Sequence, residues 1–326
     1  DGIRDSSTSR GLGDVYKSQQ LNIKVMIELK NEKIAIPIVL LAGLLWSFGP
    51  LVVRYMDDPH MVPWQYIFGR GLTIFIILNL YLYFEEGINF YKNYKKVGRS
   101  GIIGGCGLGI AMVSFIYSIT NTSAAITLLC LAAMPFFTAI LAYLFLKEKI
   151  SLNVWISIFI ATIGIIIMAL GNTEKNSLLG FLFGVTSSIG FSIFSVTLRW
   201  RKETPKFTTV ALAGLFCFVF AGLMILITQQ PFFSSSYNGS LFSLHGTLVC
   251  LGLILYSIGS KAIPAAELTL LSLTEVIGGI FWVWLPLFGI NEIPSTNTVI
   301  GGFFLFVSLI YYSLIMRWNK RYIALN

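Results

Sequence analysis

Long apolar stretches alternate with short polar segments along most of this chain. The hydrocarbon core of a membrane is about 30 Å thick and takes roughly 20 apolar residues per helix. The stretches here have that length, so the pattern predicts an all-α integral membrane protein that crosses the bilayer repeatedly. We expect ten spans, near residues 34–53, 62–84, 100–119, 123–146, 152–170, 178–198, 208–228, 241–260, 263–288 and 298–316.

The composition supports a membrane protein and argues against other classes. Charged residues make up 12% of the chain and apolar residues 56%, and this charged share is about half that of a soluble domain. The net charge of +8 lies in short loops between apolar stretches, which disfavours nucleic acid as a partner. The four cysteines stand singly, without a CxxC pair or a histidine at metal-ligand spacing, so we expect neither a metal nor a cofactor.

The basic residues fall on alternate sides of the predicted spans. Lys and Arg concentrate in short cytoplasmic loops of membrane proteins. With the N-terminus inside, nearly all of them lie in cytoplasmic loops, only Arg54 and Lys175 lie outside, and Arg70 lies within a span. The distribution predicts that both termini are cytoplasmic, in agreement with an even number of spans.

The start of the chain differs from the rest. It lacks an apolar period, resembles a translated adaptor sequence, and does not have the layout of a signal peptide. We expect the natural protein to begin near Met26. The predicted organisation is a non-native leader or polar tail over residues 1–25, a first five-helix repeat over 26–171, a second over 172–316, and a cytoplasmic tail over 317–326.

The fourth and ninth spans share a layout, in which an apolar span ends in a short acidic turn. Aligning Glu148 with Glu292 places Gly279 opposite Pro135, with Glu275 one helical turn earlier. Five spans per half is an odd number, so the second copy enters the membrane from the opposite side. Inverted repeats of this kind, arranged around a central site, recur in secondary transporters.

Four segments together resemble a known family: GLLWSFGPLVVRY (residues 43–55), FGRGL (68–72), the Ala-rich fourth span with its proline and FLKEKIS, and INEIPS at the end of the ninth. They are similar to the two-copy EamA-type pattern of the drug/metabolite transporter superfamily, over about residues 34–316. The resemblance implies a ten-helix transporter with a central cavity between its halves, which usually exports small metabolites or amino acids. The ninth span departs from the pattern because it lacks the usual helix-kinking proline.

Two charged residues inside the predicted spans are the leading site candidates. An ionisable group at membrane depth is costly unless it is paired or wetted, and such groups often mark transport pathways. Glu275 is either a carboxylate that binds a proton or a substrate ammonium, or a structural group satisfied by neighbouring helices. Arg70, between two glycines, either holds a substrate carboxylate through two parallel hydrogen bonds or pairs with Glu275 or with helix carbonyls.

Aromatic and hydroxyl residues form a second set of candidates, although most of them could simply pack between helices. Glu148, Glu292 and Pro135 are expected to shape the turns and the break of the repeats. Both histidines, His60 and His245, are placed near loop ends and belong to no catalytic motif. The residues considered for lining a cavity are Trp46, Ser47, Ser114, Tyr117, Ser188, Ser192, Tyr256 and Trp282.

The chain carries no motif of an intramembrane enzyme, such as a nucleophile with its base or paired carboxylates. A single mid-span arginine disfavours an exchanger of phosphorylated sugars. We therefore predict a secondary-active exporter of small metabolites such as amino acids or amines, working by alternating access. A uniporter or channel-like permease stays open. Its partners would be a small-molecule substrate and the lipid of a bacterial plasma (inner) membrane, and a homodimer is left open.

Overall fold

The computed structural model describes residues 32–170, 178–201, 203–290, 293 and 296–323. Within these residues every regular element is helical. Eight helical segments of the described chain are long and apolar enough to cross a membrane, and two shorter apolar helices cover Leu152–Ile167 and Val299–Tyr312. This confirms the predicted all-α membrane protein, while the number of ten spans stays a prediction.

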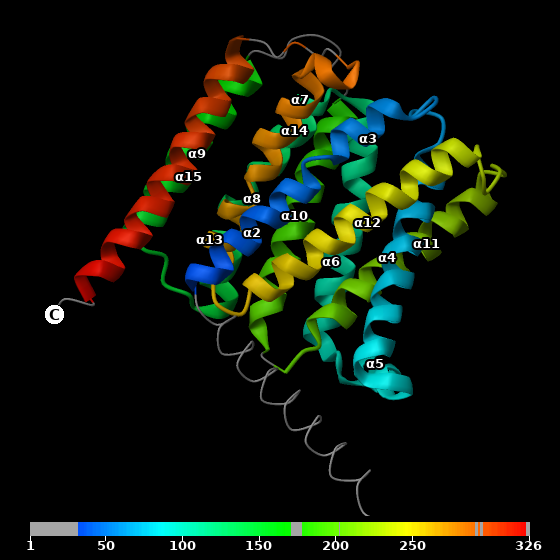
Figure 1. Ribbon diagram of the computed structural model, residues 1–326, viewed down its shortest axis with the longest axis horizontal. Helices are drawn as coiled ribbons and strands as arrows, with labels where there is room; N and C mark the ends of the chain where they lie inside the picture. Colours follow the sequence, from blue (N-terminus) through cyan, green and yellow to red (C-terminus); the bar gives the residue numbers. More distant parts are fainter. Residues whose placement is uncertain (1–31, 171–177, 202, 291–292, 294–295, 324–326) are drawn as a thin grey trace, which may run out of the picture.

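The helices pack side by side, with α9 and α15 paired along one edge and α4, α11 and α12 along the other (Figure 1). Short irregular turns of helix cover Gly87–Tyr91, Ala142–Leu146 and Pro286–Phe288. The α-helices are α2 (Glu32–Trp46), α3 (Gly49–Tyr55), α4 (Pro63–Glu86), α5 (Lys92–Lys96), α6 (Gly98–Asn121), α7 (Ala124–Leu131), α8 (Met134–Leu141), α9 (Leu152–Leu170), α10 (Leu178–Trp200), α11 (Lys206–Ile227), α12 (Ser236–Gly259), α13 (Ala265–Leu271), α14 (Thr274–Trp284) and α15 (Thr296–Ile323).

Three of the predicted spans are broken near their middle, into α2 and α3, α7 and α8, and α13 and α14. Pro50 and Pro135 stand in the first turns of α3 and α8, and proline removes a backbone N–H and clashes with the preceding turn. The third break has no proline. There the hydroxyl of Ser272 donates to the carbonyl oxygen of Thr269 at 2.8 Å, and such side-chain bonds compete with the regular helix pattern.

Glu275 and Pro135 stand at similar positions beside their breaks. Pro135 is the second residue of α8, and Glu275 is the second residue of α14. The predicted repeat alignment instead set Gly279, one turn later, opposite Pro135. The Glu275 carboxylate lies in the first turn of a helix, where the helix dipole favours negative charge.

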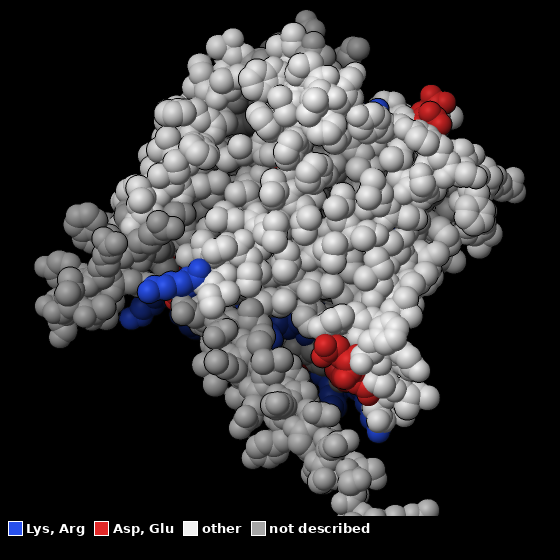
Figure 2. All heavy atoms as spheres, viewed as in Figure 1, with Lys and Arg blue, Asp and Glu red and all other residues white. Residues whose placement is uncertain are grey.

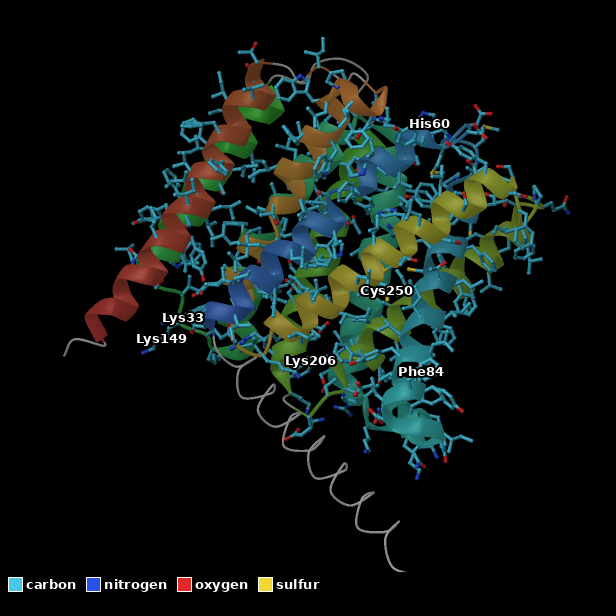
Figure 3. All side chains as sticks on the ribbon, viewed as in Figure 1. Lys33, His60, Phe84, Lys149, Lys206 and Cys250 are labelled. Carbon is cyan, nitrogen blue, oxygen red and sulfur yellow. The ribbon has the colours of Figure 1, made fainter. Side chains whose placement is uncertain are left out.

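The charged side chains are distributed unevenly over the surface. Most visible Lys and Arg side chains gather at one end, and an uncharged band separates them from the opposite end (Figure 2). Lys33, Lys149 and Lys206 lie at the charged end, which we call the basic end, and His60 lies at the other (Figure 3). Many large apolar side chains of the described chain are exposed, Leu80 among them, as expected for a protein whose surface contacts lipid.

Glycines allow the backbones of α4 and α11 to approach closely. A Cβ atom added at Gly71 would lie 3.0 Å from the carbonyl oxygen of Gly214, and one added at Gly214 would lie 2.9 Å from that of Gly71. In lipid, where apolar surface gives little drive for association, close packing of small residues holds helices together. We therefore expect this crossing to be sensitive to any added side chain.

Gly71→Val should destabilise the protein by about 1–3 kcal/mol, the usual cost of forcing extra atoms into a packed interface. The measurement is the thermal unfolding midpoint in detergent, which should fall. Gly302→Val is the matched control, because a Cβ at Gly302 meets no atom within 4 Å. Equal midpoints for the two variants would contradict the close α4–α11 contact.

Candidate functional site

A small cavity lies where helices from both halves of the chain converge. Its volume is about 60 Å³, which is room for a few water molecules at roughly 10–15 Å³ each. The wall is mostly apolar, with two charged side chains and one imidazole. It is formed by Trp46, Arg70, Leu108, Ala111, Met112, Phe115, Leu131, Met134, Ser187, Phe191, His245, Val249, Leu253 and Glu275.

Arg70 contributes a buried positive charge to this wall from α4. The side chain is 2% exposed, and its Nη2 donates to the carbonyl oxygen of Met112 at 2.7 Å. The rings of Tyr66 and Phe115 lie on either side, each 5.9 Å from the guanidinium carbon. Nε is buried without a hydrogen-bond partner among the described residues. A buried donor left unpaired is costly, so Arg70 is placed to bind an acceptor that enters the cavity.

Glu275 contributes the opposite charge to the same wall from the first turn of α14, and it is 8% exposed. Within the described part of the chain its carboxylate makes no hydrogen bond or direct ion pair, and Arg70 acts on it through space. The predicted alternative of a direct Arg70–Glu275 pair is therefore not what the structure has. Two opposite charges face one cavity without neutralising each other by contact.

His245 lies in a different place from the one predicted. The sequence pattern placed it near a loop end, because the eighth span was predicted to begin at residue 241. The helix α12 begins earlier, at Ser236, so His245 lies well inside the helix, 1% exposed and on the cavity wall. Its Nδ1 is hydrogen-bonded to the Tyr66 hydroxyl. Glu275 was predicted as a site residue because it is a titratable side chain within an apolar run, and the same signal could have identified His245.

The structure places one of the eight aromatic and hydroxyl candidates on the cavity wall and the others away from it. Trp46 lies on the wall, where its ring meets that of Phe191 edge-on at 5.5 Å. The hydroxyl of Tyr256 is instead engaged with Ser195 at 2.7 Å. Seven of the eight predicted lining residues lie off this cavity wall: Ser47, Ser114, Tyr117, Ser188, Ser192, Tyr256 and Trp282.

Several of these hydroxyls serve the helix breaks. Ser188 donates to the carbonyl oxygen of Cys130 at the end of α7, and Ser192 donates to a carbonyl oxygen of α8 at 3.1 Å. Ser47, at the break between α2 and α3, accepts a hydrogen bond from the Trp282 indole at 2.7 Å. A broken helix leaves backbone groups without intrahelical partners, and in a membrane these groups need partners from the protein.

Glu148 lies at the basic end and joins the two halves. Its carboxylate pairs with Nε of Arg199 at 2.6 Å and accepts a hydrogen bond from the backbone N–H of Ala265 at 3.2 Å, at the start of α13. Arg199 also donates to the carbonyl oxygen of Ile263 at 2.7 Å. Glu292, the predicted counterpart of Glu148, lies outside the described residues.

Comparison with known proteins identifies the class of the chain. The profile of the EamA-like transporter family matches residues 33–170. This segment belongs to that family. The match confirms the resemblance to EamA-type permeases that the sequence motifs indicated, and it covers the helices α2 to α9 that contribute Trp46 and Arg70 to the cavity.

Relatives of similar length agree with this EamA-type assignment. A protein of Helicobacter pylori (strain J99) named "Uncharacterized transporter" is 26% identical over 259 residues, which cover 76% of this chain and 84% of that protein. One of the same name in Clostridium kluyveri is 27% identical over 240 residues, 68% of this chain and 75% of its own length. The chain is a transporter.

A solved structure supports the fold. A crystal structure described only as that of a protein superposes with a TM-score of 0.69 at 16% identity. The superposition covers 89% of this chain and 100% of the other. The chain therefore shares its helical arrangement with a protein of very different sequence.

Ser188→Ala should lower the unfolding free energy by about 0.5–1.5 kcal/mol, because the Cys130 carbonyl oxygen at the α7–α8 break loses one of its two hydrogen bonds and keeps the one from the Ala133 N–H. Ser243→Ala is the matched control, since Ser243 is exposed and its hydroxyl bonds only to its own helix. Thermal unfolding in detergent measures both. An unchanged midpoint for Ser188→Ala, together with altered substrate affinity, would instead return Ser188 to the binding site.

Proposed function

We propose that this EamA-type chain is a secondary-active transporter that exports small metabolites, such as amino acids or amines, by alternating access. The observation that carries the proposal is the pair Arg70 and Glu275, which bring opposite charges to one cavity without direct contact. Export is proposed because the family resemblance implies it. A uniporter or channel-like permease is the second candidate.

The packing supports ten spans arranged as an inverted repeat over residues 26–171 and 172–316. α6 packs on α10, and α2 packs on α12; α6 also contacts α11, and α4 contacts α12. The pairs α4–α11 and α9–α15 join corresponding helices of the two halves. If each helix is replaced by its counterpart in the other half, α6–α10 becomes α12–α2 and α6–α11 becomes α12–α4, while α4–α11 and α9–α15 are unchanged. Two inverted copies can exchange conformations, which is the basis of alternating access.

The paired charges support a substrate that carries both signs. A guanidinium binds a carboxylate through two parallel hydrogen bonds, and a carboxylate binds an ammonium or a proton. In a low-dielectric site an unpaired charge is expensive, so a zwitterionic amino acid would neutralise both Arg70 and Glu275. An amine would neutralise Glu275 alone.

The size of the cavity supports alternating access over an open pore. At about 60 Å³ it is far below the roughly 300 Å³ or more of common ligand pockets. A metabolite therefore requires the helices to move apart. The conformation described here corresponds to a closed state of the proposed cycle.

The charge distribution supports an orientation with both termini in the cytoplasm of a plasma (inner) membrane. The start of α2 and the end of α15 both lie at the basic end (Figure 1, Figure 3). Lys and Arg favour the cytoplasmic side.

Glu275→Gln should raise the KM for a transported amino acid about 10- to 100-fold and abolish accumulation driven by a pH gradient, because a charge-assisted hydrogen bond of about 1.5–3 kcal/mol is lost. The measurement is counterflow of labelled amino acids and amines in proteoliposomes, with and without the gradient. Glu85→Gln is the control, since Glu85 is exposed near the end of α4.

If Glu275→Gln exchanges and accumulates substrate like the wild type, the carboxylate is structural and the site lies elsewhere. If the wild type exchanges substrate but ignores the pH gradient, the uniporter alternative replaces proton coupling. If labelled compounds cross without counterflow, a channel-like permease is the better description.

A further inference from the structure

We propose that His245 determines specificity in this cavity, by donating a hydrogen bond from Nε2 to the carboxylate of the substrate beside Arg70. The residue would thereby favour amino acids over the corresponding amines. The inference rests on the proposed transport function and adds to it a residue, a donor atom and a choice between the two substrate classes.

A hydrogen bond between Tyr66 and His245 connects the two halves of the chain. His245 lies on α12 and Tyr66 on α4, and both are almost completely buried. Tyr66 precedes Arg70 by one helical turn, so the two side chains are neighbours on α4. The Tyr66 ring lies 5.9 Å from the guanidinium carbon and 5.6 Å from the His245 ring. Tyr66 therefore connects two side chains of the cavity wall, Arg70 and His245.

The hydrogen bond between Tyr66 and His245 decides which imidazole nitrogen carries the proton. A neutral imidazole has one donor and one acceptor nitrogen. Among the described residues the Tyr66 hydroxyl has only Nδ1 of His245 as an acceptor, and a buried hydroxyl proton without an acceptor costs about 1–3 kcal/mol. Tyr66 therefore donates to Nδ1, and Nε2 carries the imidazole proton, an assignment that follows from the hydrogen-bond network.

Nε2 is free to bind a group in the cavity. Within the described chain it has no hydrogen-bond partner, and its ring belongs to the cavity wall. Gly49, at the start of α3, packs closely beside this nitrogen, and a Cβ atom there would lie 2.9 Å from Nε2. Nε2–H is thus a fixed donor with nothing to donate to until a substrate enters.

A carboxylate suits this side of the cavity better than any other substrate group. Arg70 offers an unpaired Nε there, and His245 adds a second donor from another helix, while a carboxylate has lone pairs for both. Glu275 repels a carboxylate and attracts an ammonium. A simple amine has no acceptor for Nε2–H and brings a charge of the same sign as Arg70.

The test replaces His245 by Gln or Asn, whose side-chain amides reach different positions of the imidazole ring. The side-chain amide of Gln extends to about the position of Nε2, whereas that of Asn reaches only about the position of Nδ1. We expect His245→Asn to raise the KM of the transported amino acid about tenfold and His245→Gln to keep it within about threefold. Tyr66→Phe, which releases Nδ1, should give an intermediate rise.

The probes are the twenty amino acids in proteoliposome counterflow, followed by the amine that lacks only the carboxylate of the best one, measured as an inhibitor. In His245→Asn the inhibition constant of the amine should stay at the wild-type value, and the melting temperature should change by no more than about 2 °C. Equal losses for amino acid and amine, or a large fall in melting temperature, would assign His245 to the fold. Unchanged KM in both variants would remove it from the site.

Different results would contradict the proposed function and this inference. If the wild type transports none of the twenty amino acids, the substrate class is wrong and the role of His245 falls with it. If the wild type transports one of them and the two His245 variants behave alike, the transport proposal stands and the specificity role of His245 is overturned.

Discussion

Every backbone N–H and C=O group inside a membrane needs a partner within the protein, and the helix breaks bring this constraint to the centre of the molecule. The described chain has three such breaks, at α2–α3, α7–α8 and α13–α14. Serine hydroxyls from neighbouring helices add hydrogen bonds to carbonyls beside the breaks, as Ser188 does for Cys130, which also accepts from the N–H of Ala133. Helices of all three broken spans line the cavity, so the breaks lie beside the place where a substrate would bind.

The same breaks position the charges. Glu275 lies in the first turn of α14 because that helix restarts at Thr274, and the helix dipole there favours a carboxylate. Arg70 is held in place by the carbonyl oxygen of Met112 and by two flanking rings. A fold selected only for stability would gain from pairing or removing these charges, so their separation around one cavity points to a ligand.

Further contacts join the two halves of the chain around this site. At the basic end the Arg199–Glu148 pair joins the two halves, with a second contact from Glu148 to the start of α13. Nearer the cavity the rings of Trp46 and Phe191 both pack against Tyr256, at 5.4 and 5.2 Å. The close glycine-mediated crossing of α4 and α11 is a further contact between the halves.

The sequence by itself determined the class of the protein, because the length of an apolar run is set by membrane thickness and needs no neighbours to be read. It also placed Arg70 and Glu275 within spans and indicated the EamA resemblance. Only the tertiary structure decided that His245 meets Tyr66, that Ser188 faces a backbone carbonyl, and that Glu275 lies in the first turn of a helix. Helices that are apolar on all sides carry little amphipathic pattern, so which face points inward depends on how distant segments pack.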